Sequence, residues 1–99
     1  MIVARQVFQA RYGKGDEVVE ICKSFAERIQ TDEPSMRLRV LTDVSGPFFT
    51  IVVEFEVESL AAWEHMFGQG MTQPWMGPLF GRMAELIESG SREFYRVVV

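Results

Sequence analysis

The spacing of apolar residues along the first third of the chain predicts a strand followed by a helix. Apolar and polar residues alternate over positions 2–10, a period of two that is typical of a strand. A turn with two glycines follows at 12–15, and the acidic pair Asp16 and Glu17 then supplies the negative charge that stabilises a helix N-terminus. We expect the helix to end before Pro34, because a proline disfavours helical geometry in the residue before it. Its apolar face consists of Val18, Ile21, Cys22, Phe25, Ala26 and Ile29.

The next two apolar segments predict a β-hairpin whose register can be argued from both of its faces. Residues 36–43 and 48–57 are the expected strands, and residues 44–47 are the turn. One register places the apolar residues of both strands on one face and sets opposite charges across from each other on the other face. Its pairs are Leu38 with Phe55, Val40 with Val53, Arg37 with Glu56, and Arg39 with Glu54.

The last part of the chain predicts a second helix in two pieces and a final strand. Ser59 is expected to cap the first piece, and glycines at 68–70 are expected to interrupt it. The second piece is expected to start at 72–74, where a proline suits the first turn, and to end at 89–90. Residues 92–99 are then the last strand.

This order of elements predicts the fold class and a partner. A single domain over residues 1–99 with the order βαββαβ favours an α+β, ferredoxin-like fold, with a four-stranded antiparallel sheet and both helices on one face. The other sheet face would keep Val7, Leu41, Phe48 and Val52 beside the Arg–Glu pairs. We expect a second copy of the chain to cover this face, so that two sheets form a dimeric α+β barrel.

Composition and charge support a homodimer and disfavour several other partners. A hydrophobic content of 47% is high for 99 residues, which leave little interior to hold it. The net charge of −4 argues against nucleic acid, and no apolar run is long enough to span a bilayer. The N-terminus lacks the pattern of a signal peptide, and the single cysteine, Cys22, fits a reduced cytoplasmic protein.

The whole chain resembles the dimeric α+β barrel superfamily. The resemblance lies in the order of elements, in the segment Phe8-Gln9-Ala10-Arg11-Tyr12-Gly13-Lys14-Gly15-Asp16-Glu17-Val18, and in the aromatic, Trp-containing second helix. It is similar in particular to small monooxygenase-like and NIPSNAP-like members. That superfamily includes cofactor-independent quinol and polyketide oxygenases, haem-degrading enzymes, isomerases and stress-response proteins. The chain contains no Asn, whereas the haem-degrading and polyketide-oxygenase branches use an Asn on the first strand.

The residues that could carry chemistry are few. His65 is the only histidine; it is either an ordinary helix residue or a proton-transferring or haem-ligating side chain at a pocket mouth. With no second His or Cys at ligand spacing, we expect no metal site, and no motif indicates a cofactor. Cys22 lies on an apolar helix stripe, which favours a buried thiol over a nucleophile.

The segment 63–83 is rich in Met and aromatic residues, which are either core or the wall of an apolar pocket. In the pocket hypothesis Gln6 points under the helices from the first strand. We then expect Gln6 and His65 to be the catalytic candidates, and the substrate-binding candidates to be Trp63, Met66, Trp75 and Tyr95.

Three hypotheses for function follow. The first is a cofactor-independent monooxygenase-like or isomerase-like enzyme that acts on a small aromatic or quinone-like compound. The second is a non-catalytic dimeric module that binds a small apolar molecule or serves in a stress response. The third is a purely structural protein, which requires the space under the second helix to be filled by the protein's own side chains.

Overall fold

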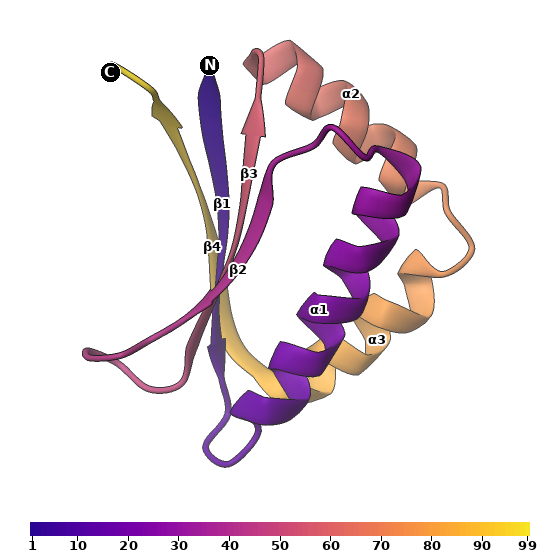
Figure 1. The fold of residues 1–99 in the computed structure, drawn as a ribbon. Coiled ribbons are helices and arrows are strands. Elements are labelled where there is room, and N and C mark those ends of the chain that lie inside the picture. The colour runs from indigo at the N-terminus through magenta and orange to yellow at the C-terminus, as the bar shows by residue number, and fades with distance from the viewer.

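The computed structural model describes residues 1–99 as one layer of helices on one face of a four-stranded antiparallel sheet (Figure 1). Both chain termini lie at the same end of the sheet, and the β2–β3 hairpin extends away from the helices (Figure 1). The elements in chain order are β1 (Ile2–Ala10), α1 (Gly15–Asp32), β2 (Leu38–Thr42), β3 (Thr50–Val57), α2 (Leu60–Met71), α3 (Met76–Leu86) and β4 (Ile87–Arg96). The predicted α+β, ferredoxin-like fold is confirmed.

The sheet has the strand order β2-β3-β1-β4, with β1 and β3 in the centre. The predicted hairpin register is confirmed, because Leu38 pairs with Phe55 and Val40 with Val53. The central pair of strands is equally regular, from Ile2 opposite Val57 to Gln9 opposite Thr50. Both faces of the hairpin therefore carry the residues that the alternation assigns to them.

The core lies between the sheet and the helices. On β3 the residues facing the helices are buried, with Ile51 1% and Val53 2% exposed, and on α1 Val18 is fully buried. Each of these side chains gains about 1.5–3 kcal/mol by leaving water. Packing against α1 therefore fixes which face of β3 points inward.

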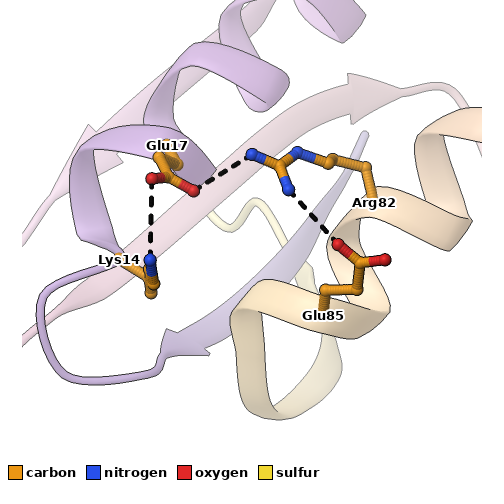
Figure 2. Close-up of polar contacts among 4 residues, drawn as sticks. All are labelled: Lys14, Glu17, Arg82 and Glu85. Carbon is orange, nitrogen blue, oxygen red and sulfur yellow. Dashed lines mark hydrogen bonds and ion pairs between the residues drawn. The ribbon is translucent and has the colours of Figure 1, made fainter.

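Ion pairs at one end of the molecule join α1 to α3. Figure 2 shows Glu17 on α1 between Lys14 and Arg82, with Arg82 also reaching Glu85 on its own helix. The Glu17–Arg82 oxygen and nitrogen are 3.2 Å apart, and Lys14 lies 3.8 Å from Glu17. These side chains are about half exposed or more, so each pair adds under about 1 kcal/mol, and only Glu17–Arg82 links the two helices.

The hairpin strands are one to two residues shorter at their ends than expected and the last strand ends three residues earlier, and two further boundaries are wrong by more. The glycines at 68–70 do not interrupt α2, which continues to Met71; the break falls at 72–75, around Pro74. Two glycines cost a helix about 1 kcal/mol each, whereas proline disfavours helical geometry in the residue before it. The last strand starts at Ile87 rather than at 92, because residues that were expected to end the helix pair with β1 across a register shift at Gln9/Ala10.

The sheet face away from the helices carries alternating apolar and charged rows. Leu41, Val52 and Val7 lie side by side on β2, β3 and β1. The next row along the strands alternates in charge and consists of Arg39, Glu54, Arg5 and Glu93. Arg39 hydrogen-bonds to Glu54, and Arg5 lies 3.5 Å from Glu54 and 3.6 Å from Glu93. We call these two rows the outer face.

Candidate functional site

A cavity of about 340 Å³ lies between the sheet and the helices, and all three helices and three of the four strands contribute to its wall. Sixteen of its 19 lining residues are hydrophobic. Its size falls at the lower end of the ~300–1,000 Å³ range of small-molecule sites. The lining residues are Gln6, Phe8, Ile21, Cys22, Phe25, Ile29, Val53, Phe55, Trp63, Met66, Phe67, Gly70, Met76, Leu79, Phe80, Met83, Ala84, Ile87 and Arg92.

Two polar side chains meet at the cavity wall from neighbouring strands. Gln6 on β1 and Arg92 on β4 are partners in the strand register, so their side chains share the helix-facing side of the sheet. The Arg92 Nε–H donates a hydrogen bond of 3.2 Å to the Gln6 side-chain oxygen. The rest of the wall is apolar, so this pair is the polar end of the cavity.

Aromatic rings hold the Arg92 guanidinium in place. Its central carbon lies 4.8 Å from the ring centre of Trp63 and 4.7 Å from that of Phe67. The two rings stack on each other with centres 4.9 Å apart, and Phe94 meets Trp63 edge-on at 5.0 Å. Because Arg92 is exposed, its contact with the aromatic rings gains about 0.5–1 kcal/mol, and through this contact α2 helps to position the charge of β4.

Cys22 contributes a thiol to the cavity wall from α1. Its side chain is only 3% exposed. Burial raises the pKa of the Cys22 thiol from 9.0 to about 11. The group is therefore a neutral thiol at physiological pH and acts as a small apolar side chain there.

Three of the predicted site residues lie together at the cavity. Gln6 points under the helices, and Trp63 and Met66 line the wall from α2. Trp63 is 9% exposed and belongs to the core as well. The cavity thus has the aromatic wall and the amide that the pattern of the sequence predicts.

The structure does not bring His65 and Trp75 into this cavity. Both line a neighbouring groove of about 810 Å³ along α2 and the end of α1, which shares Ile29, Met66 and Gly70 with the cavity wall. His65 is two positions from Trp63 on α2, about 200° around the helix axis, so it faces outward when Trp63 faces inward. Trp75 packs on Phe25 and on Arg28, with the guanidinium 5.1 Å from its ring centre.

Tyr95 lies on the opposite side of the sheet from Gln6. Because Gln6 pairs with Arg92, alternation along β4 sends residues 92 and 94 toward the helices and Tyr95 toward the outer face. There the Tyr95 ring receives the Arg5 guanidinium at 5.9 Å. The expected grouping of Tyr95 with Gln6 in one pocket is therefore not what the structure shows.

Arg92 is the site residue that reasoning from the sequence missed. A single arginine within a polar strand shows no sequence pattern that marks it as a binding residue. Its place follows only from the β1–β4 register, which depends on the shift at Gln9/Ala10.

Neither a metal-binding cluster nor a membrane-spanning helix is present in the structure. No three His, Cys, Asp or Glu side chains lie where they could hold a metal ion. None of the three helices combines the length and apolarity that crossing a bilayer requires.

Comparison with known proteins places the fold. No protein-family model and no curated protein matches the sequence. Among solved structures, the chain is similar to an uncharacterized NIPSNAP domain protein from Burkholderia xenovorans, with a TM-score of 0.84 at 19% identity over 99% of this chain and 95% of that one.

Two further structures extend the range of similar proteins. A candidate antibiotic biosynthesis monooxygenase from Deinococcus radiodurans has a TM-score of 0.75 at 12% identity, over 98% of this chain and 92% of its own. A dimeric protein of unknown function with a ferredoxin-like fold, from Bacteroides fragilis, has a TM-score of 0.70 at 18% identity, over 97% and 96%. All three structures are less than 20% identical to this chain, so the similarity shows its fold, an α+β, ferredoxin-like fold with a four-stranded antiparallel sheet.

Proposed function

We propose that this protein binds a small, largely apolar aromatic molecule in the cavity between its sheet and its helices. The observation that carries the proposal is the cavity itself, an open volume of about 340 Å³ whose wall is apolar except at the Gln6–Arg92 end. A wall of this kind, apolar with few polar groups, is typical of small-molecule sites. The open volume favours this proposal over the purely structural hypothesis, which requires the space to be filled by side chains.

We propose further that the working form is a homodimer in which the outer faces of two sheets pack together. The charges on this face are already paired within each protomer, so a second sheet can cover them without leaving a lone charge. The similar protein from Bacteroides fragilis is described as dimeric. In such a dimer each cavity lies on the side of its sheet away from the partner.

Calorimetric titration with naphthalene-1-carboxamide, a neutral fused aromatic, tests the binding proposal. Leu79 lines the cavity from α3, and Leu79→Trp fills part of it. We expect this variant to bind at least about tenfold more weakly than the wild type, because the indole occupies space that the ligand needs; a tenfold change corresponds to about 1.4 kcal/mol.

Leu60→Trp is the matched control, because Leu60 is an exposed leucine on α2 outside the cavity. Its affinity should equal that of the wild type. Equal affinity of Leu79→Trp, or no binding by the wild type, would contradict the proposal.

A second candidate function is cofactor-independent monooxygenation of a quinol-like ring, which the similarity to the Deinococcus radiodurans protein favours. In that reaction one atom of O₂ enters the ring and the other leaves as water, while the quinol supplies two electrons and becomes a hydroxyquinone. Oxygen uptake with 1,4-dihydroxynaphthalene above its autoxidation rate, and lost in Leu79→Trp, would support it. Ligand binding without oxygen uptake above the autoxidation rate would favour the non-catalytic binding module instead.

A further inference from the structure

Arg92 is a cation without an anion in the protein. The chain carries 14 acidic and ten basic side chains, yet no carboxylate lies within ion-pair distance of Arg92. The only hydrogen bond of its side chain is the one from Nε to Gln6. Arg92 is exposed at the cavity wall, so water solvates the guanidinium in the free protein, and the acceptor groups of a ligand can replace that water.

The groups left free at this end of the cavity are mostly donors. A guanidinium has five N–H bonds and no acceptor, so four remain on Arg92 after the bond to Gln6. That bond takes one of the two lone pairs of the Gln6 side-chain oxygen and leaves the amide nitrogen, with two N–H bonds, without a partner in the protein. A ligand that brings acceptor oxygens to this end therefore makes the most hydrogen bonds.

The donors are also fixed before any ligand arrives. Trp63 and Phe67 hold the guanidinium plane, and Gln6 fixes its Nε edge. A preorganised group loses little conformational entropy on binding, and the planar guanidinium matches a carboxylate or phenolate better than a flexible ammonium does.

We propose that the ligand is a small aromatic monoanion, a carboxylate or a phenolate, with its oxygens on Arg92 and Gln6 and its ring in the apolar part of the cavity. This proposal rests on the proposed function and names its ligand class. An aromatic body is favoured over an alkyl chain because rings and thioethers, among them Phe25, Phe80 and Met83, supply much of the wall.

Calorimetry with three probes of known structure tests the proposal: naphthalene-1-carboxylate, its neutral analogue naphthalene-1-carboxamide, and octanoate. The wild type should bind the carboxylate about 10–100-fold more tightly than the amide, as hydrogen bonds to charged groups contribute about 1.5–3 kcal/mol. It should bind octanoate more weakly than the aromatic carboxylate.

Arg92→Gln should remove this preference, because the carboxylate loses more than the neutral amide does when the charge is removed. Circular dichroism and the melting temperature report whether the variant is folded. The matched control is Arg96→Gln on the same strand, an exposed arginine outside the cavity, which should keep the preference. Gln6→Met removes the second donor group and should weaken carboxylate binding specifically.

The outcomes separate the two proposals. Two results would overturn the proposed role of Arg92 in binding an anion: equal binding of carboxylate and amide by the wild type, or a preference for the carboxylate that survives Arg92→Gln. The cavity would then still stand as a binding site for a neutral ligand. Octanoate binding as tightly as the aromatic carboxylate would overturn the aromatic class. Failure of all three probes to bind the wild type would overturn the proposed function together with this inference.

Discussion

Cys22 shows how the fold changes the chemistry of a single side chain. The thiol faces apolar neighbours between α1 and the sheet, and its burial raises its pKa from 9.0 to about 11. Below pH 9 the thiol is neutral in the folded and the unfolded chain, so it does not affect stability with pH. Above pH 9 only the unfolded chain ionises, which favours unfolding until the folded thiol also ionises near pH 11.

The wild type should therefore lose stability between pH 9 and pH 11 by up to about 1.4 kcal/mol per pH unit through this residue. Cys22→Ala has no thiol and should lack this part of the loss. Urea unfolding of both proteins at pH 8, 9, 10 and 11 gives the difference. Parallel curves for the two proteins would show that the thiol is not shielded as described.

Individual site residues were predictable only where the alternation of apolar and polar residues along a strand shows which face of the sheet their side chains occupy. Gln6 was predicted to point under the helices on the condition that Arg5 and Gln9 lie on the other side of the sheet, and Gln6 lines the cavity under the helices. Arg92 and Tyr95 could not be placed, because their strand is polar and its apolar pattern does not reveal its register.

At the scale of elements, the start of α2 is set by one hydrogen bond. The Ser59 hydroxyl oxygen accepts from the Ala62 N–H at 3.0 Å, which confirms the predicted cap. This bond satisfies one of the N–H groups that the first turn leaves free. Since α2 carries Trp63 and Phe67, the cap also sets where the aromatic wall of the cavity begins.

Ser59→Ala should lower the unfolding free energy by about 1 kcal/mol and the melting temperature by about 4–8 °C. Ser24→Ala is the matched control, because Ser24 is an exposed serine within α1 that has no side-chain hydrogen bond; its effect should stay within about 0.5 kcal/mol. Thermal unfolding followed by circular dichroism measures both. A Ser59→Ala protein as stable as the wild type would contradict this role.

Elements were predictable wherever two independent signals agreed. In the β2–β3 hairpin the apolar face and the charged face both specify one register, and the structure has that register. Only nearby glycines and a proline indicated where the break between α2 and α3 would fall, and packing decides which of them ends the helix. Trp63 and Phe67 hold α2 against the sheet and Arg92, so the helix continues past Gly68 to Met71.

At the scale of the whole molecule, the outer face is the interface of the proposed dimer. Val7 lies in its apolar row and Val52 beside it is 8% exposed. Val7→Lys would place an unpaired charge between the two sheets of a dimer, at a cost of several kcal/mol. Native mass spectrometry at micromolar concentration should show a dimer for the wild type and a monomer for Val7→Lys.

Leu60→Lys serves as the control for this variant, because it adds the same charge at an exposed position of α2. It should remain dimeric. A monomeric wild type would contradict assembly through the outer face, and so would a Val7→Lys variant that still forms dimers.

The cavity as a binding site is tested most directly by the methyl NMR signals of the six methionines during titration with naphthalene-1-carboxylate. Met76 and Met83 line the cavity and not the groove, whereas Met1 and Met36 line the groove and not the cavity. An aromatic ring in the cavity should shift the signals of Met76 and Met83 and leave those of Met1 and Met36 in place. Shifts confined to Met1 and Met36, or no shifts at all, would contradict binding in the cavity.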